Sequence, residues 1–515
     1  MKRFLLFTTI ILWACAAWAQ DEAMLKYAET ITPSDLKKHL EILASDEYEG
    51  RETGEKGQKM AADYIYKHFK ANGLIGPVKS NAANNYFQPF ELVKTYWKDC
   101  TIKTGTTELK LFEDFFPYGR FSVDNKELDV VFAGYGIDTE TYSDYKNLDV
   151  EGKIVVVMRN APTSKKIKVP SKYTSTSAKA RVARSKGAAL IIFVYDTDKE
   201  FQDKNLVFKG FFSKPSIGFD KKKTKARAGT LFTSPSNAAK ILNTEAAIFN
   251  KAMAKMKKKG KSAAGKFTGK ASITVDLKKE PVQTENVLGY IEGTDKKDEL
   301  LVLTAHYDHV GVINGEIHNG ANDDGSGTVA VLEMAEAFAQ AAANGHRPRR
   351  SILFMTVTGE EKGLLGSQYY SENPIFPLEN TVVNLNTDMI GRSDKQHKDD
   401  PNYIYIIGSD MLSSDLHNLH EEIGERHFPK LSLDYTYNSA NDPNRYYYRS
   451  DHYNFAKHNI PVIFYFNGTH EDYHKPTDTV DKINFEQAAE VTKLTFCTAW
   501  IIANRDTRIE VDKAK

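Results

Sequence analysis

The chain has little cysteine, no excess of charge of one sign, and no long apolar run beyond its first residues. Its three cysteines, Cys15, Cys100 and Cys497, are too few for a disulfide-dense scaffold or a cysteine metal cluster. The formal net charge of +1, from 69 basic and 68 acidic residues, gives no electrostatic case for nucleic acid or an anionic membrane as a partner. We therefore expect a globular protein without nucleic-acid partners and without an integral membrane span.

The first residues predict an export signal that spans residues 1–19. Two basic residues precede a short apolar run, and Ala17-Trp18-Ala19 has the small-x-small pattern of a cleavage site. We expect cleavage after Ala19 and export to the periplasm, the cell surface or the medium. Cys15 loosely matches a lipidation site, but the bulky Trp13 before it makes a lipoprotein the less favoured alternative.

The next two segments differ in texture. From about residue 32 to residue 72 the apolar spacing predicts helices, with a polar, turn-rich loop at residues 49–54. Residues 101–280 contain short apolar strands and form a β-rich module, whose polar residues do not cluster with metal-ligand spacing. We interpret the lysine-rich run at 251–270 as a solvated helix end and loop rather than an anion-binding site.

From residue 286 onward, strand-like runs alternate with helical ones, which predicts an α/β layer fold with a mostly parallel central sheet flanked by helices. The predicted strands are 286–291, 300–304, 352–358, 382–386, 403–407 and 461–466, and the predicted helices are 329–343, 364–372 and 485–504.

Imidazole and carboxylate side chains follow several of these strands. Ligands collect beyond the carboxyl ends of parallel strands, so we expect these groups to converge on one edge of the sheet. So many carboxylates cannot share a site without a compensating cation, and the mixture of imidazole and carboxylate without thiolate fits zinc. The candidates that follow the strands are His306, Asp308, His309, Asp323, Asp324, Glu360, Glu361, Asp388, His470, Glu471, Asp472, Tyr473 and His474.

Together these residues resemble a known family. His306-x-Asp308, the run 320–327 (Gly-Ala-Asn-Asp-Asp-Gly-Ser-Gly), Gly359-Glu360-Glu361, Asp388 and His474 resemble the co-catalytic zinc metallopeptidases of family M28, which includes leucyl-type aminopeptidases and glutamate carboxypeptidases. The segment 46–54 resembles the amino-terminal signature of secreted members. The segments 134–136, 144–145 and 148–153 resemble a protease-associated (PA) domain.

The resemblance implies a domain order. Residues 20–100 and 281–515 would form the peptidase domain with its zinc-peptidase α/β fold. Residues 101–280 would form a β-rich PA domain inserted into it.

The resemblance also implies two Zn²⁺ ions per chain. His306 and Asp388 would bind one ion, Glu361 and His474 would bind the other, and Asp323 would bridge the two. Two metals held in this way can share one bridging carboxylate.

Three further roles are implied around the metals. Glu360 would be the general base, Asp308 would hydrogen-bond His306 and fix its tautomer, and Tyr473 would help to stabilise the oxyanion. His309, His318 and Asp324 match no ligand role and are interpreted as supporting or structural residues, and Ser450-Asp451-His452 matches a recurrent motif near the active site.

These implications favour a secreted metallo-aminopeptidase that acts on peptide or protein substrates, with the oligomeric state left open. A carboxypeptidase or dipeptidase of the same family remains an alternative, with Arg392, Arg445 and Arg449 as possible carboxylate clamps. A glutaminyl cyclase-type acyltransferase would hold one zinc. A receptor-like binding module would show a broken ligand pattern, and no ligand position is broken.

Overall fold

The computed structural model describes residues 21–79, 84–119, 121–164, 166–220 and 228–513. The predicted signal segment and Cys15 lie outside these residues. The chain divides into two compact units: Val93–Pro281 is unit 2, and Met1–Leu92 together with Val282–Lys515 is unit 1. The first division lies before residue 101, the boundary expected from sequence, and strand β1 (Phe87–Thr104) runs through both positions.

Two chain-wide features concern membranes and thiols. Within the described ranges, no helix combines the length and the apolar character that a membrane crossing requires. Cys100, in unit 2, and Cys497, in unit 1, are both buried free thiols.

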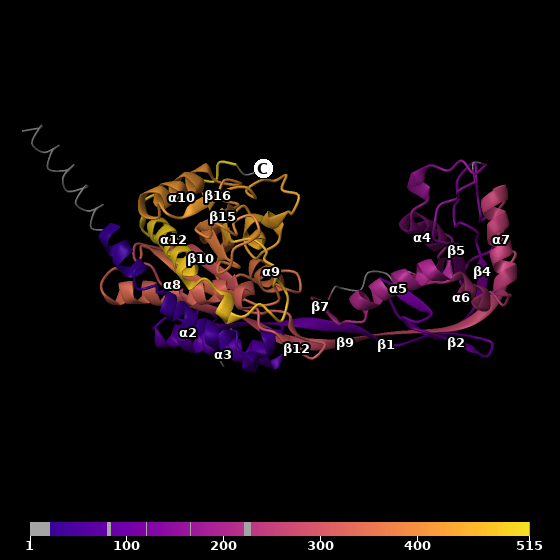
Figure 1. The fold of residues 1–515 in the computed structure, drawn as a ribbon, viewed down its shortest axis with the longest axis horizontal. Helices are drawn as coiled ribbons and strands as arrows, with labels where there is room; N and C mark the ends of the chain where they lie inside the picture. The colour runs from indigo at the N-terminus through magenta and orange to yellow at the C-terminus, as the bar shows by residue number, and fades with distance from the viewer. Residues whose placement is uncertain (1–20, 80–83, 120, 165, 221–227, 514–515) are drawn as a thin grey trace, which may run out of the picture. The chain divides into compact units, whose positions relative to one another are not determined.

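Unit 1 is built on one twisted sheet with the strand order β16-β15-β17-β14-β10-β13-β9 (Figure 1). Strands β17, β14, β10 and β13 run parallel, whereas β9 and β15 are antiparallel to their neighbours in this group. This arrangement confirms the predicted α/β fold with a mostly parallel sheet. The strands are β9 (Thr268–Ile291), β10 (Lys296–His306), β13 (Arg350–Val357), β14 (Thr381–Thr387), β15 (Tyr403–Ile407), β16 (Ser432–Asp434) and β17 (Val462–Phe466).

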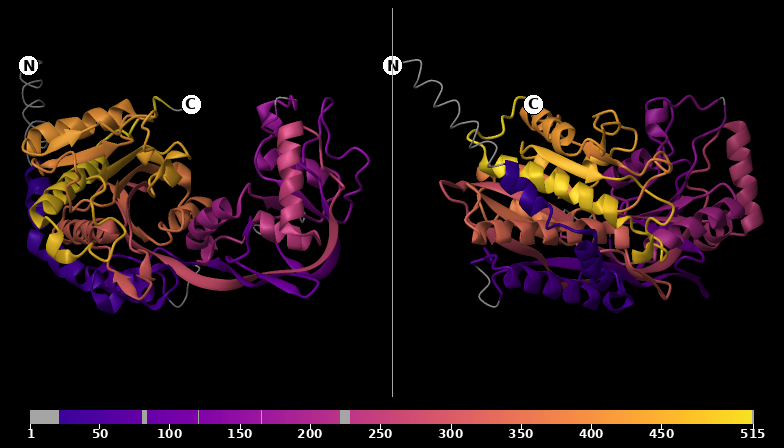
Figure 2. Two further views of the ribbon diagram at one scale, coloured as in Figure 1. Left: turned by 45° about the vertical axis from the view of Figure 1, so that its right-hand side comes forward. Right: turned by 60° about the vertical axis from the view of Figure 1, so that its left-hand side comes forward.

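Helices cover both faces of this sheet (Figure 2). Alternate residues along β10 point to opposite faces, so Leu301 and Leu303 pack with α2, α3, α8, α10 and α12, while Val302 packs with α9 and α11. The helices are α2 (Pro33–Leu43), α3 (Lys56–Ala71), α8 (Gly327–Ala343), α9 (Leu365–Glu372), α10 (Ser414–His427), α11 (Tyr453–Ala456) and α12 (Phe485–Asn504).

Helix α8 matters most for the site. Most of its residues are buried, because it packs against the sheet and also against α2, α3 and α12. An almost wholly apolar helix of this kind is typical of a buried central element. It fixes the polar turn Ala321–Ser326 that leads into its first residue, Gly327.

The strands of unit 2 carry two apolar cores, one on each face of the sheet. Strands β4, β5, β6 and β8 are parallel neighbours, β3 lies antiparallel to β8, and the first half of β9 lies antiparallel to β4. Its elements are β2 (Thr107–Lys110), β3 (Phe115–Tyr118), β4 (Val123–Phe132), β5 (Ile154–Met158), β6 (Leu190–Val194), β7 (Ser216–Gly218), β8 (Gly229–Thr233), α4 (Thr176–Ser185), α5 (Asp198–Phe212), α6 (Pro235–Ile241) and α7 (Ala246–Lys259).

Within the described residues of unit 2, four α-helices accompany the strands, which is more helix than the β-rich expectation included. The apolar strands stand out in sequence, whereas α5 and α7 are lysine-rich and bury few side chains. Helix α7 ends at Lys259 with Gly260 in the left-handed conformation, so the first part of the lysine-rich run is a helix end followed by a loop.

Candidate metal centre

The candidate site lies where the parallel strands of unit 1 end. His306 is the last residue of β10, Glu361 follows β13, Asp388 follows β14, and the loop after β17 contains His474. Asp323 comes from the turn before α8. The strands run in the same direction, so their carboxyl ends meet at one edge and bring these five side chains together.

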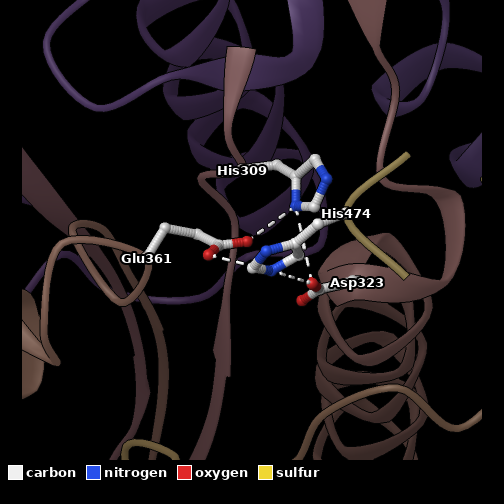
Figure 3. A group of neighbouring side chains, drawn as sticks. All are labelled: His309, Asp323, Glu361 and His474. Carbon is white, nitrogen blue, oxygen red and sulfur yellow. Dashed lines mark ion pairs between the residues drawn. The ribbon is translucent and has the colours of Figure 1, made fainter. Parts of the chain in front are cut away.

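The side chains form two groups whose ligand atoms lie within 4.8 Å of one another. One group contains His309, Asp323, Glu361 and His474 (Figure 3), and the other contains His306, Asp323 and Asp388. All five residues predicted as ligands are therefore neighbours, and Asp323 belongs to both groups.

The two oxygens of Asp323 face different groups. Its Oδ1 lies 3.3 Å from His306 Nε2, whereas its Oδ2 lies 2.9 Å from His474 Nε2. The backbone N–H of Asp323 donates to Asp478 Oδ2 at 3.2 Å, which helps to hold the turn in place. A carboxylate placed in this way can bridge two cations.

The site concentrates negative charge away from water. Burial raises the pKa of Asp388 to about 6, and repulsion from Asp323 adds to this effect. Although burial favours the neutral imidazole, Asp323 and Glu361 raise the pKa of His474 to about 10. Carboxylates that share a buried space in this way require positive charge. A divalent cation with imidazole and carboxylate ligands fits that requirement, so the residues suit zinc.

Glu360 lies beside both groups without belonging to either. Its Oε2 is 3.8 Å from His306 Nε2, and burial raises the pKa of Glu360 well above its usual value. A carboxylate with a raised pKa is suited to accept and return a proton near neutral pH.

The contact between Asp308 and His306 differs from the prediction in its atoms. His306 Nδ1 lies 3.0 Å from the backbone carbonyl oxygen of Asp308, whereas the Asp308 carboxylate is 3.8 Å away. That carboxylate instead accepts from the Thr53 hydroxyl at 2.7 Å and from the Glu360 N–H at 3.2 Å. The carbonyl can accept a proton from Nδ1, which leaves the lone pair of Nε2 pointing toward Asp323.

Tyr473 stacks on His474, with ring centroids 3.9 Å apart. Burial raises the pKa of the Tyr473 phenol above its usual value, and nearby carboxylates add to the shift, so the hydroxyl keeps its proton. Tyr473 is therefore available as a hydrogen-bond donor beside the metal groups.

The Ser450-Asp451-His452 motif contacts the candidate ligand Asp388. The Ser450 hydroxyl donates to Asp388 Oδ2 at 2.6 Å and accepts from the Asn386 side chain. Asp451 accepts from Ser367, and His452 stacks on Phe464. The motif orients Asp388.

Several supporting residues could not be assigned from sequence. Fully buried Arg51 donates to backbone carbonyls of Tyr307, Asn319 and Gly320, which ties the two ligand-bearing loops together. Its only sequence signal is its place in the 46–54 segment. His318, interpreted as a supporting residue, contacts the carbonyl of His474 through Nδ1 at 3.0 Å.

Asp324 also fits its supporting interpretation, because its carboxylate accepts from backbone N–H groups of His306, Gly327 and Met389. His309 does not fit, because its Nδ1 lies 2.8 Å from Glu361 Oε1 inside the first group.

A small pocket opens beside the second group. Tyr446, Phe464 and Phe466 contribute aromatic rings to it, and Arg449 lies at its wall. The lining also includes His306, Asp323, Glu360, Asp388 and Tyr473, so a molecule in this pocket would touch the candidate ligands.

Residues 286–498 match the sequence model of Peptidase family M28, and this range includes every candidate residue of the site. Over these residues the chain is similar to M28 peptidases. The two groups of side chains within this range are two candidate metal sites. The match does not extend to residues 93–281, so the insertion is not identified by it.

Curated relatives and solved structures resemble the chain as follows. A probable zinc metalloprotease of Pyrenophora teres f. teres is 30% identical over 261 residues, which cover 43% of this chain and 52% of that protein. Aminopeptidase YwaD of Bacillus subtilis is 29% identical over 239 residues, which cover 44% and 47%. The chain spans about half the length of these curated relatives.

The aminopeptidase structure from Aneurinibacillus sp. strain AM-1 covers 96% of this chain and 98% of its own with a TM-score of 0.55 and 19% identity. At this identity the likeness shows the fold alone.

Proposed function

We propose that this protein is an exported aminopeptidase that binds two zinc ions and removes N-terminal residues from peptides. The observation that carries the proposal is the pair of ligand groups that share Asp323, with Glu360 beside both and in neither. Relatives named as a zinc metalloprotease and an aminopeptidase support the same reaction class.

The residues would hold the metals as two overlapping sets. His306 and Asp388 would bind one ion, Glu361 and His474 would bind the other, and Asp323 would bridge them. When bound, zinc ions polarise a carbonyl group and lower the pKa of water toward neutrality.

The chain's own groups would perform the proton transfers. Glu360 accepts the proton of the attacking water and later donates it to the leaving amine, and its raised pKa suits both steps. The Tyr473 hydroxyl donates a hydrogen bond to the developing oxyanion. The Asp308 carboxylate accepts a hydrogen bond from the backbone N–H of Glu360, and the Asp308 carbonyl oxygen contacts His306 Nδ1.

The direction of exopeptidase action separates this proposal from the alternatives. Of the three arginines considered as carboxylate clamps, Arg392 pairs with Asp472 at 3.1 Å and Arg445 stacks on Tyr448. Arg449 lines the pocket and is exposed. A carboxypeptidase or dipeptidase would use such a cation for a terminal carboxylate, and a cyclase would need a single zinc.

The test measures zinc per chain together with hydrolysis of aminoacyl p-nitroanilides before and after chelation. We expect about two zinc ions, activity lost on chelation and restored by zinc, and no cleavage of N-acetylated substrates. Activity on C-terminal dipeptides with blocked amines would instead indicate a carboxypeptidase, and a single zinc without hydrolysis would indicate a cyclase.

Export and the identity of the insertion belong to the same proposal. We propose that residues 1–19 are removed as a signal peptide, and mass analysis of the mature protein tests this against lipidation of Cys15. We also propose that residues 101–280 contain a PA domain that controls access of long substrates. If replacing the insertion by a short linker left the preference for long over short peptides unchanged, that role would be rejected.

A further inference from the structure

We propose that His309 is a protein ligand of the metal held by Asp323, Glu361 and His474, coordinating through Nδ1. This inference rests on the proposed metal centre and adds to it, because the family resemblance assigns no ligand role to His309. It makes the two metal sites unequal, with four protein donors at one and three at the other.

The distances between donor atoms in this group are close to the distances between the corners of a zinc coordination tetrahedron. His309 Nδ1 lies 2.8 Å from Glu361 Oε1 and 3.7 Å from Asp323 Oδ2. His474 Nε2 lies 2.9 Å from the same Asp323 oxygen and 3.1 Å from Glu361 Oε2. Four donors held 2.0–2.2 Å from a tetrahedral zinc are separated from one another by about 3.3–3.6 Å. The observed separations fall on both sides of that value, so one ion could contact all four residues after small shifts.

The donor atoms also lack other partners. His309 Nδ1, Asp323 Oδ2, Glu361 Oε1 and His474 Nε2 are buried, and across the described ranges none of them makes a hydrogen bond. The short contacts between them are not aligned as hydrogen bonds, although the atoms are close enough. Leaving several buried polar atoms unpaired costs about 1–3 kcal/mol for each. A cation between them would satisfy all four at once.

Packing, rather than a hydrogen bond, directs the His309 ring into the group. The side chain is fully buried, and its backbone N–H donates to the Arg51 carbonyl at 3.2 Å. A Cβ added at Gly320 would come within 2.5 Å of the ring, so the glycine turn lies directly against it. The ring lies 5.5 Å from that of His474 at an interplanar angle of 76°, and both point inward (Figure 3).

The inequality has a functional consequence. Zinc sites closed by four protein ligands hold their metal firmly, whereas catalytic zinc sites keep a position open. The site with His309 would be the tighter of the two and would anchor the bridging Asp323. The site with His306 and Asp388 would keep its open position next to Glu360 and the aromatic pocket.

The decisive test is X-ray absorption at the zinc edge on the full-length protein, loaded with one equivalent of zinc. We expect two imidazole ligands for the wild type and one for His309→Leu. A matched control is His420→Leu, because His420 is also fully buried with both ring nitrogens unpaired, and it lies on α10. The control should keep two imidazoles.

A competitive titration with a chromophoric chelator gives the second measurement. In His309→Leu we expect the tighter zinc dissociation constant to weaken by more than about tenfold, with the control unchanged. A single imidazole in the wild type at one equivalent would overturn the proposal, as would a tighter constant that changes less than about threefold. Either result would leave the proposed two-zinc aminopeptidase function intact. Failure of the protein to bind any zinc would instead reject the proposed function itself.

Discussion

Unit 1 and unit 2 both bury ionisable side chains, and the two sets differ in what surrounds them. In unit 2, Asp144 is almost fully buried. Its carboxylate accepts from the backbone N–H groups of Tyr135 and Ile137 and from the hydroxyls of Tyr142 and Ser262. Each oxygen therefore has donors from the protein itself.

Lys179, also in unit 2, is satisfied in the same way. Its ammonium group donates to the carbonyl oxygens of Met158, Arg159 and Asn160 at 2.8–3.1 Å. It lies on α4 and joins that helix to the end of β5. Burial of a charged group in this unit therefore accompanies a structural role.

The edge of the sheet in unit 1 shows the opposite arrangement. Asp323 Oδ2, Glu361 Oε1 and His474 Nε2 are buried and make no hydrogen bond within the described residues. These residues belong to one group of candidate metal ligands, in which Asp323 Oδ2 lies 2.9 Å from His474 Nε2. The comparison teaches that burial alone does not distinguish a functional group from a structural one. Convergent, unpaired donor atoms do, because they imply a partner that the chain does not supply.

We expect Glu360→Gln to have the largest effect of the substitutions in the two units. The amide keeps the shape of the side chain but cannot accept the proton of water, so we expect kcat to fall by about a thousandfold. Zinc content should stay at the wild-type value, since Glu360 belongs to neither ligand group. Glu316→Gln, at an exposed position on β12 (Glu316–His318), is the control and should keep full activity. A fully active Glu360→Gln enzyme would show that the base is another group.

Metal removal should affect stability only where donors are unpaired. Zinc at about a thousand times its dissociation constant stabilises the folded protein by about 4 kcal/mol. We expect chelation to lower the unfolding temperature of unit 1, because the buried carboxylates then repel one another. Hydrogen exchange by mass spectrometry can follow both units, and the amides around Asp144 should keep their protection. Equal loss of protection in both units would contradict the distinction.

Lys179→Met tests the buried ionisable groups of unit 2, whose hydrogen-bond partners come from the protein itself. The apolar side chain fills similar space but leaves three buried carbonyls without their donor, so we expect a loss of about 1–3 kcal/mol in the free energy of unfolding. Zinc content and kcat on short substrates should not change. Lys251→Met, at an exposed position on α7, should leave stability unchanged. Loss of zinc in Lys179→Met would break the separation between the two sets.

The same variant carries a pH prediction. Burial lowers the pKa of Lys179 from 10.5 to about 8, so above pH 8 the unfolded state binds more protons than the folded state at this position. Stability therefore rises with pH through this range. Relative to Lys179→Met, the wild type should gain about 1 kcal/mol between pH 8 and pH 9 in urea unfolding. If the difference in unfolding free energy between the two proteins did not change with pH, the pKa of Lys179 would not be lowered in the folded state.

The fold and the metal groups were predictable for a common reason. Apolar strands such as 300–304 stand out in sequence, and parallel strands place the residues after them at one edge. The sequence alone therefore predicts that His306 and Asp388 lie close together. The structure brings all the predicted ligands together, and their roles remain predictions until the metal is measured.

His309 and Arg51 could not be placed from sequence, for physical reasons. Whether His309 reaches Glu361 depends on the path of the turn at Gly320, which lies against its ring, and on the loop that Arg51 holds. The contact between Arg51 and Gly320 joins segments more than 250 residues apart, and local sequence pattern does not encode it. The helices of unit 2 were partly missed for a different reason, because α5 and α7 bury few side chains and therefore give a weak helical pattern in sequence.

The smallest predicted effect extends the comparison to arginines. Arg392 has a carboxylate partner in Asp472, whereas within the described residues Arg449 forms no ion pair and instead packs its guanidinium over the Tyr446 ring. An unpaired cation at the pocket wall should favour substrates whose N-terminal residue is acidic. We expect Arg449→Gln to lower kcat/KM for glutamyl p-nitroanilide about two- to fivefold relative to leucyl p-nitroanilide, since an exposed charge pair contributes about 1 kcal/mol or less. The effect should shrink at high salt. An equal loss on both substrates would mean that Arg449 shapes the pocket through its packing on Tyr446 rather than through its charge.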